Sequence, residues 1–301
     1  MSVICTFVAL LIPGQCPPFK QHLISTMRKM YLILIGLFTS GLAISQTTQY
    51  EVYALKYASL VHDSLETSTK KDSVSVDFML WLIKGNGKNI LMDAGYLYSV
   101  EAAKDFDMID DLRPDSTLQK LAVRPEDITD IILTYPHFDH VNSIDQFPNA
   151  QVWVQKDDYT YYTTTAWQKG GVNSEFNKKE VRKLIDLHAT GKVTLIEGYD
   201  KEIIAGLRIF PGTRKPSLPH YALIRTAVGN MALASDNVWI YYNSNFVTPA
   251  PSFSTFDANG YIKAMQRMQM LVTDEKLIMP GYDAATFSKF PVITEGVIRL
   301  K

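Results

Sequence analysis

The stretch of sequence that decides the fold is Glu126–Gln155, which reads EDITDIILTYPHFDHVNSIDQFPNAQVWVQ. Within it, the apolar run Ile131–Leu133 predicts a buried strand, and Gln151–Val154 predicts another. Directly after the first of these strands the chain turns through residues 135–140, YPHFDH. Loops that are carried on the edge of a rigid sheet are where functional sites are usually built. The stretch therefore predicts a sheet with a site at the end of one buried strand.

The loop offers three candidate metal ligands, His137, Asp139 and His140. Two imidazoles and a carboxylate within four residues can converge on one cation, and zinc accepts nitrogen and oxygen donors of this kind. The same spacing also occurs in polar loops and helix caps. The spacing alone therefore leaves both interpretations open.

Polar residues follow other predicted strands in the same way. They are Asp93, Asp236 and Asp283. The strands before them are predicted over residues 76–83 and 89–92, which form a hairpin around Gly85-Asn86-Gly87, over residues 231–234 and over residues 277–279, the last strand of the chain.

The rest of the chain alternates strands with helices in two similar halves, and no linker divides residues 46–301. This order predicts an α/β (α+β) fold in one domain, with two sheets packed face to face and helices outside. The further predicted elements are a strand over 50–57, a helix over 118–121 that stops at Pro125, a helix over 181–188, paired strands over 192–197 and 202–210, a strand over 221–225 paired with 231–234, and a helix over 261–272.

Blocks of this sequence resemble the metallo-β-lactamase superfamily, in particular its N-acyl-homoserine lactonase-like branch. Besides Glu126–Gln155, the blocks that carry the resemblance are EVYALKYA (51–58), FMLWLIKGNGKNILMDAGY (78–96), PGTRKPSLPH (211–220), LASDN (233–237) and MPGYD (279–283). They follow one another in the family's order and cover nearly all of residues 46–301. The resemblance implies the four-layer αβ/βα sandwich of that family.

The resemblance also implies a set of metal ligands, which is incomplete here. The family pattern is H-x-H-x-D-H, a His in P-G-H, a bridging Asp, and a His in a final P-G-H-D. The positions that match are His137, Asp139, His140 and Asp236. The positions that depart are Tyr135, Thr213 and Tyr282, each of which stands where the family has histidine.

The departures are shared unevenly between the family's two metal positions. The first keeps only His137 and Asp236, whereas the second keeps Asp139, His140 and Asp236 and gains Tyr282. The resemblance therefore implies one divalent metal ion, with zinc expected first. Iron and manganese are alternatives, because tyrosinate is a harder ligand than imidazole.

Three further residues carry two interpretations each. Tyr135 and Tyr282 either ligate the metal or fill the vacated space with a hydroxyl that is hydrogen-bonded to Asp236 or Asp139. His220 either swings toward the site as an additional ligand or serves as a structural hydrogen-bonding residue.

The residues around the ligands are also ambiguous. Asp93 matches a family aspartate that orients the motif histidines without binding the metal itself. It also suits a turn cap before Gly95. Trp239, Tyr241 and Tyr242 suit either an aromatic wall for an acyl chain or core packing.

Two functions of different classes fit these features. The first is a metal-dependent hydrolase that acts on a lactone or related ester, a small molecule that can carry an acyl chain. Its catalytic residues are expected to be Asp139, Tyr135 and Tyr282. The alternative is a non-catalytic binding protein on the same fold, which the three missing imidazoles favour.

Composition and the amino terminus limit the possible partners and the expected cellular location. The 30 Lys+Arg nearly balance the 31 Asp+Glu, and no basic stripe indicates nucleic-acid binding. Residues 27–45 are typical of a signal peptide, because Arg28-Lys29 precede an apolar run that is too short to span a membrane. We expect cleavage after Ser45, a periplasmic or secreted product without stable membrane insertion, and an upstream segment over 1–26. Both cysteines, Cys5 and Cys16, lie in that segment.

Overall fold

The structure is a computed structural model, and it describes residues 49–67, 70–105, 108–173, 176–212, 219–251, 255 and 257–301. The predicted upstream segment, the signal peptide over 27–45 and Thr213 lie outside these residues. Thr48–Lys301 forms one compact unit. Among the described residues, no helix is both long enough and apolar enough to cross a membrane.

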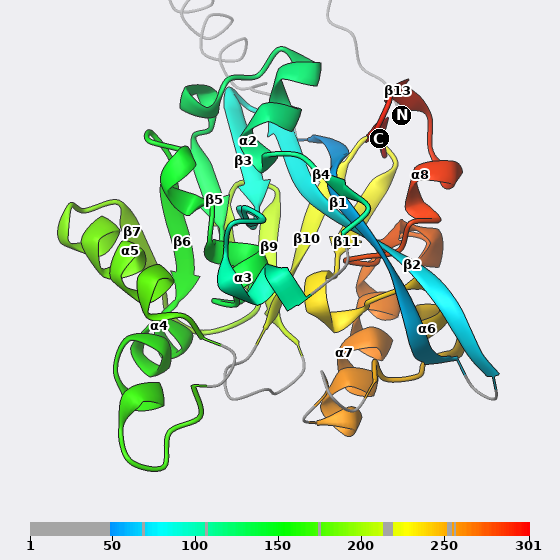
Figure 1. The fold of residues 1–301 in the computed structure, drawn as a ribbon. Helices are drawn as coiled ribbons and strands as arrows, with labels where there is room; N and C mark the ends of the chain where they lie inside the picture. Colours follow the sequence, from blue (N-terminus) through cyan, green and yellow to red (C-terminus); the bar gives the residue numbers. More distant parts are fainter. Residues whose placement is uncertain are drawn as a thin grey trace, which may run out of the picture. The chain divides into compact units, whose positions relative to one another are not determined.

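Two β-sheets form the frame of this unit (Figure 1). The larger sheet runs in the order β13-β14-β1-β2-β3-β5-β6-β7, with β4 paired to β1. Its strands are β1 (Glu51–Thr67), β2 (Lys70–Gly85), β3 (Lys88–Met92), β4 (Asp110–Asp111), β5 (Asp130–Ile132), β6 (Gln151–Gln155), β7 (Val193–Ile196), β13 (Val292–Thr294) and β14 (Val297–Arg299).

The smaller sheet runs in the order β12-β11-β10-β9-β8. Its strands are β8 (Lys201–Ile204), β9 (Leu207–Pro211), β10 (His220–Thr226), β11 (Gly229–Leu233) and β12 (Ile278–Met279). The predicted pair over 221–225 and 231–234 is confirmed as β10 and β11.

Helices cover the sheets, as the sequence pattern predicts. They are α2 (Pro114–Thr117), α3 (Phe138–Val141), α4 (Lys156–Thr163), α5 (Lys178–Ala189), α6 (Tyr241–Phe246), α7 (Ala258–Leu271) and α8 (Thr286–Lys289). The 3-10 turns are η1 (Glu101–Asp105), η2 (Leu118–Leu121), η3 (Pro125–Asp127), η4 (Ile144–Gln146), η5 (Thr165–Trp167), η6 (Ser235–Asn237) and η7 (Glu275–Leu277). The two sheets with helices confirm the predicted metallo-β-lactamase sandwich.

The apolar core lies in layers, because alternate residues of each strand face opposite sides of their sheet. Between the sheets, Ile83 and Met92 of the larger sheet pack in one cluster with Ile209 and Leu233 of the smaller one. A second cluster joins the larger sheet to the elements around α3, α4 and α5. A third joins the smaller sheet to α7, which buries its Tyr261–Met268 face.

Strand direction is what brings the polar loops together. Strands β3, β5 and β6 are parallel, so the segments that follow β3 and β5 leave the larger sheet at the same edge. These segments contain Asp93 and residues 135–140. In the smaller sheet β11 and β12 are parallel, so Asp236 and Tyr282 also share an edge.

Three details of the predicted elements are wrong. Residues 202–210 form two strands, β8 and β9, because the chain turns at Gly206 with φ of 81°. Strand β7 does not pair with them and instead lies parallel to β6 in the other sheet. The strand over 277–279 is not the last, because β13 and β14 follow and pair onto the edge of β1.

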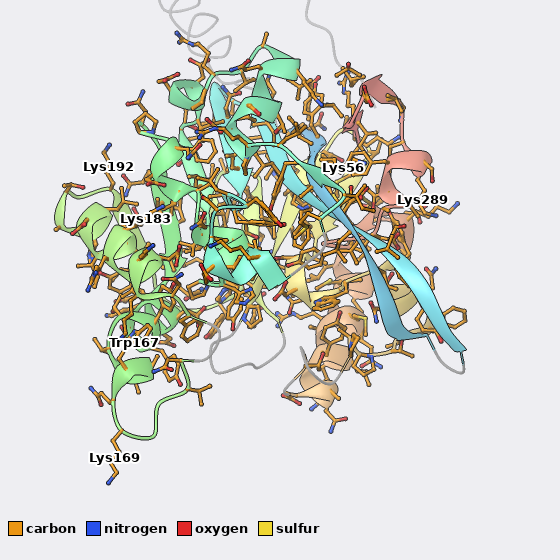
Figure 2. All side chains as sticks on the ribbon, in the orientation of Figure 1. Lys56, Trp167, Lys169, Lys183, Lys192 and Lys289 are labelled. Atoms are coloured by element: carbon orange, nitrogen blue, oxygen red, sulfur yellow. The ribbon has the colours of Figure 1, made fainter. Side chains whose placement is uncertain are left out.

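The lysines labelled in Figure 2 lie on two sides of the described part of the chain. Figure 2 shows Lys169, Lys183 and Lys192 on the side of α4 and α5, with Lys56 and Lys289 on the opposite side.

Candidate metal centre

Asp93 joins the end of β3 to the loop that follows β5. Its two carboxylate oxygens accept hydrogen bonds from the Thr134 backbone N–H at 2.8 Å and the Thr134 hydroxyl at 2.7 Å. Its Oδ2 also lies 2.8 Å from Nδ1 of His140. A hydrogen bond at Nδ1 fixes the ring, so Nε2 of His140 faces the opposite way, as it does in metal-binding histidines. Asp93 reaches this place with a positive φ of 64°, which is uncommon for a residue with a side chain.

The two loops are further bound to each other and to α5. The Ala94 N–H donates to the His140 carbonyl at 2.7 Å, and the Leu97 N–H donates to the Asn142 side chain at 3.0 Å. The Asn142 amide in turn donates to the buried Glu180 carboxylate at 2.5 Å. The backbone that carries the candidate ligands is therefore held by the scaffold.

Donor atoms of four residues lie close together where the edges of the two sheets meet. The Tyr282 hydroxyl lies 2.5 Å from Asp236 Oδ1, 3.0 Å from Asp139 Oδ2 and 3.2 Å from His140 Nε2. His140 Nε2 lies 3.3 Å from Asp236 Oδ1 and 3.6 Å from Asp139 Oδ1. These residues come from three separate segments, which the fold brings together.

This donor set fits one metal ion. At metal–ligand distances of about 2.0–2.2 Å, the ligands of a tetrahedral cation lie about 3.3–3.6 Å from one another. Most of the spacings among Asp139, His140, Asp236 and Tyr282 fall close to that range. The adjoining cavity of about 20 Å³ is lined by Asp93, Asp139, His140 and Tyr282 among others. Such a volume holds about one water molecule.

His137 and Tyr135 lie beside this donor set. The ligand atoms of His137, Asp139 and His140 all lie within 4.8 Å of one another, and His137 Nδ1 is 2.5 Å from Asp139 Oδ1. The Tyr135 ring is fully buried and stacks on His137, with centroids 5.8 Å apart. The other replaced position, Thr213, lies outside the described residues.

Neighbouring carboxylates shift the pKa values of the groups at the site. Burial lowers the pKa of His140, but the nearby carboxylates of Asp139, Asp93 and Asp236 outweigh burial and hold it well above its usual value. Burial raises the pKa of Asp139, yet the two histidines bring its net shift downward. Burial and two carboxylates raise the pKa of the Tyr282 phenol well above 10. A bound cation would reverse this for Tyr282, because ligand oxygens lose their protons to a metal.

His220 contacts the scaffold and not this donor set. Its backbone N–H donates to the Thr134 carbonyl at 3.0 Å, and its Nδ1 lies 3.4 Å from Asp158 Oδ2. Its ring stacks on Tyr199, and burial lowers its pKa to about 4. These contacts favour the structural interpretation of His220 over that of an additional ligand.

The aromatic residues near the site differ from those singled out in the sequence. Trp239 packs edge-on against Tyr282, with centroids 5.7 Å apart. Tyr242 instead packs against Phe246. Tyr241 lines a separate cavity of about 780 Å³. Of the three residues, only Trp239 therefore contacts a candidate ligand.

Strand β2 supplies the lining that sequence reasoning missed. Phe78 packs edge-on against Tyr282 at 5.6 Å, and Met79 and Trp81 line the small cavity. The strand reaches the site because the Asp77 N–H donates to the Tyr282 carbonyl at 2.9 Å. In the sequence, the apolar block over 78–83 indicated a strand, and nothing in it indicated that its side chains line the site.

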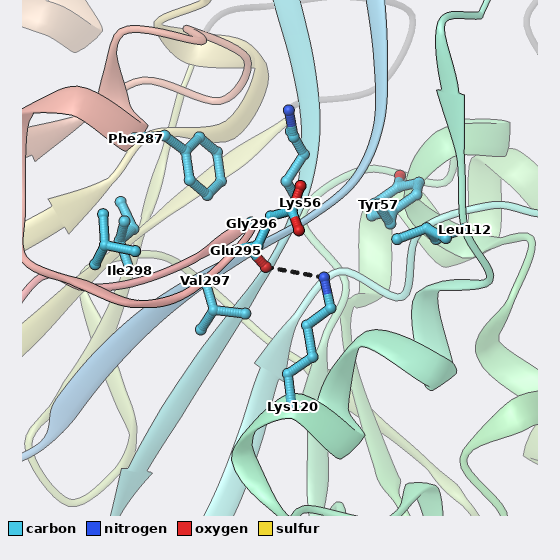
Figure 3. Close-up of a pocket in the computed structure, with 10 residues that line it drawn as sticks. Lys56, Tyr57, Leu112, Lys120, Phe287, Glu295, Gly296, Val297 and Ile298 are labelled. Carbon is cyan, nitrogen blue, oxygen red and sulfur yellow. Dashed lines mark hydrogen bonds between the residues drawn. The ribbon is translucent and has the colours of Figure 1, made fainter.

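Tyr57 lines the small cavity and also a second one of about 340 Å³ (Figure 3). Lys120 lies in this second cavity, where its amine donates to the Glu295 carbonyl at 2.9 Å. Phe287, Val297 and Ile298 form part of its wall.

Comparisons with known proteins agree with this geometry. The model of the metallo-beta-lactamase superfamily matches residues 80–206. An N-acyl homoserine lactonase of Bacillus cereus is 23% identical over 167 residues, which are 55% of this chain and 60% of that protein. The lactonase AttM of Agrobacterium fabrum is 33% identical over 63 residues, 20% of this chain and 24% of that protein. The chain thus spans about 60% of the length of the first of these curated relatives.

Solved structures show the same fold at low sequence identity. A quorum-quenching N-acyl homoserine lactone lactonase superposes with a TM-score of 0.64 at 21% identity, covering 82% of this chain and 98% of that one. The dizinc quorum-quenching lactonase AidC, in complex with a product, superposes with a TM-score of 0.58 at 14% identity, covering 79% of this chain and 92% of that one.

Proposed function

Because this chain is a member of the metallo-β-lactamase superfamily, we propose that it is a metal-dependent hydrolase of lactones or related esters. The observation that carries the proposal is the convergence of Asp139, His140 and Asp236 on one small cavity. These three residues would hold the metal ion. When bound, the ion polarises a carbonyl group and lowers the pKa of a water molecule.

The protein's own groups position the reaction. Asp93 holds the His140 ring in place through Nδ1. Asp139 accepts the proton of the attacking water, and His137, 2.5 Å from Asp139 and 27% exposed, connects that carboxylate to solvent. Tyr135 remains a proposed donor to the oxyanion that develops on the carbonyl. The Tyr282 hydroxyl, 2.5 Å from Asp236, is the other proposed donor.

The lining supports a neutral, apolar substrate. Tyr57, Phe78, Met79 and Trp81 line the small cavity, and no lysine or arginine is among its lining residues. A cavity of about 20 Å³ admits a water or an ion and not a whole substrate.

One observation favours the alternative, a binding protein without turnover. The Tyr282 hydroxyl already lies within hydrogen-bonding distance of Asp139, His140 and Asp236, so a network of protons can satisfy these groups without a metal.

Metal content and ester hydrolysis separate the two functions. We expect the purified chain to carry one metal ion per molecule by elemental analysis and to hydrolyse acyl lactones or p-nitrophenyl esters. The variants Asp139→Asn and His140→Ala should lose both properties. Tyr242→Phe, which alters a tyrosine packed against Phe246, is the matched control and should keep both. A folded wild-type chain that contains no metal and turns over no ester would support the binding protein.

A further inference from the structure

We infer that the Tyr282 oxygen is the fourth ligand of this site and that the resulting donor set selects ferric iron over zinc. The inference rests on the proposed metal-dependent function and concerns which cation serves it. It departs from the zinc that the family resemblance implies.

The position of the phenol oxygen supports ligation. It lies 3.0 Å from Asp139 Oδ2 and 3.2 Å from His140 Nε2, close to the spacing of neighbouring ligands around one cation, whereas its 2.5 Å distance from Asp236 Oδ1 is that of a hydrogen bond and must lengthen when a cation replaces the proton. A space-filling tyrosine that is hydrogen-bonded to Asp236 and Asp139 would make the same contacts, and ligation differs from it by the loss of the hydroxyl proton to the cation. Here Phe78 and Trp239 contact the ring edge-on, and the oxygen points at the other donors. The aromatic contacts therefore hold the oxygen at a ligand position.

The backbone of the residue is fixed as firmly as its ring. The Tyr282 N–H donates to the Trp239 carbonyl at 3.0 Å, and its carbonyl accepts from the Asp77 N–H at 2.9 Å. The preceding Gly281 lies against the Ser235 backbone so closely that a Cβ there would be 2.7 Å from the Ser235 oxygen. The loop thus cannot withdraw Tyr282 without breaking contacts with β2 and with the segment of η6 and Trp239.

The charge and hardness of the donor atoms determine which cation the site prefers. When the cation replaces the hydroxyl proton, which passes to the buffer, Asp139, Asp236 and Tyr282 supply three anionic oxygens and His140 one neutral nitrogen. Counted over the four donors alone, three negative charges match a trivalent ion and leave a net negative charge with a divalent one, and the buried Asp93 carboxylate behind His140 adds to the negative charge. Oxygen ligands also favour hard cations, whereas zinc accepts nitrogen and sulfur ligands readily.

Visible absorption tests the inference without any measurement of activity. The full chain is stripped with a chelator and titrated with one equivalent of ferric nitrilotriacetate, with zinc chloride in a parallel competition. A phenolate bound to ferric iron gives a charge-transfer band in the visible range, which free tyrosine lacks. We expect this band in the wild type, and we expect ferric iron to persist when zinc is added in equal amount.

Variants assign the band to one tyrosine. Tyr282→Phe should abolish the band and weaken iron binding on the order of tenfold or more, because the site loses one of four ligands. Tyr135→Phe, which alters a buried tyrosine beside the same histidines, should keep the band. Tyr282→His should also lose the band and shift the preference to zinc, so it tests the inference even where Tyr282→Phe folds poorly.

The possible results distinguish failure of the tyrosine ligand from failure of the proposed hydrolase. Iron binding without a band, a band that survives in Tyr282→Phe, or displacement of iron by equimolar zinc would each overturn the inference. Metal-dependent ester hydrolysis with zinc and no band would leave the proposed hydrolase standing and remove only the tyrosine ligand. A band without any hydrolysis would support the ligand and count against the proposed activity. No binding of either metal would overturn both.

Discussion

At the scale of single residues, Asp93 shows how a carboxylate can act on a site without belonging to its donor set. It contacts His140 Nδ1 and both donors of Thr134, and the Ser235 hydroxyl lies 3.3 Å from its Oδ2. Residues that hydrogen-bond to a ligating imidazole fix its orientation and strengthen its basicity.

Asp93→Asn should therefore weaken metal binding by about 10–100-fold, the range for such supporting partners. The amide can still accept from the Thr134 N–H, but an amide nitrogen facing His140 Nδ1 cannot accept its proton. Metal affinity by competition with a chromophoric chelator is the measurement. Asp127→Asn, which alters an exposed carboxylate paired with Arg124, is the control and should bind like the wild type. Equal affinities in both variants would mean that Asp93 only shapes the turn.

The replaced ligand positions should behave as a unit. Tyr135→His, Thr213→His and Tyr282→His together recreate the full family pattern, whereas each single change leaves a first-site metal without enough ligands. The effects should therefore be non-additive. Elemental analysis should find two zinc ions per chain in the triple variant and no more than one in each single variant. A soluble, folded triple variant with one metal would show that these positions do not correspond to the family's ligands.

At the scale of elements, the start of strand β10 supports the loop that follows β5. The His220 N–H and the Thr134 carbonyl form a backbone hydrogen bond, and the His220 side chain is 2% exposed. This contact links the smaller sheet to the loop that carries the candidate ligands, so the state of His220 bears on the stability of the whole junction.

His220 predicts a dependence of stability on pH. Burial lowers its folded pKa to about 4, whereas an unfolded histidine titrates near 6.5. Between these values the unfolded chain binds a proton that the folded chain does not. The free energy of unfolding should therefore fall as pH decreases from about 6.5 to about 4, by about 1.4 kcal/mol per pH unit at most from this group. Urea unfolding of the wild type and of His220→Asn across this window measures the contribution. An equal slope in both proteins would assign the loss to other groups.

At the scale of the whole molecule, the compact unit begins at Thr48, close to the cleavage point expected after Ser45. A leader that ends just before the folded unit can be removed without cutting into a sheet. Both cysteines lie before that point, so the product would need no disulfide in an oxidising compartment.

Export is therefore a prediction about the intact protein. Expression of the full sequence in a Gram-negative host should yield a periplasmic product whose amino terminus is Gln46 by mass spectrometry. Substituting Arg28 and Lys29 with Glu should retain the precursor in the cytoplasm, since the positive region directs insertion of the signal. A wild-type cytoplasmic product that still carries Met27 would contradict the prediction.

The sequence by itself determined the fold and most of the elements that carry the site. Strand β5, the hairpin of β2 and β3 and helix α7 follow from local apolar periodicity, which does not depend on distant contacts. The family blocks also predicted that His137, Asp139, His140 and Asp236 belong to one site, because motif order survives at low identity.

Only the tertiary structure decided how the donors meet and what surrounds them. The direction of the Tyr282 hydroxyl depends on Phe78 and Trp239, which lie far from it in sequence. The split of residues 202–210 and the addition of β13 and β14 likewise depend on pairing with distant strands. Local pattern reports which residues prefer a strand or a helix, whereas long-range packing sets where a side chain points. That direction is what places the Tyr282 oxygen beside Asp139, His140 and Asp236.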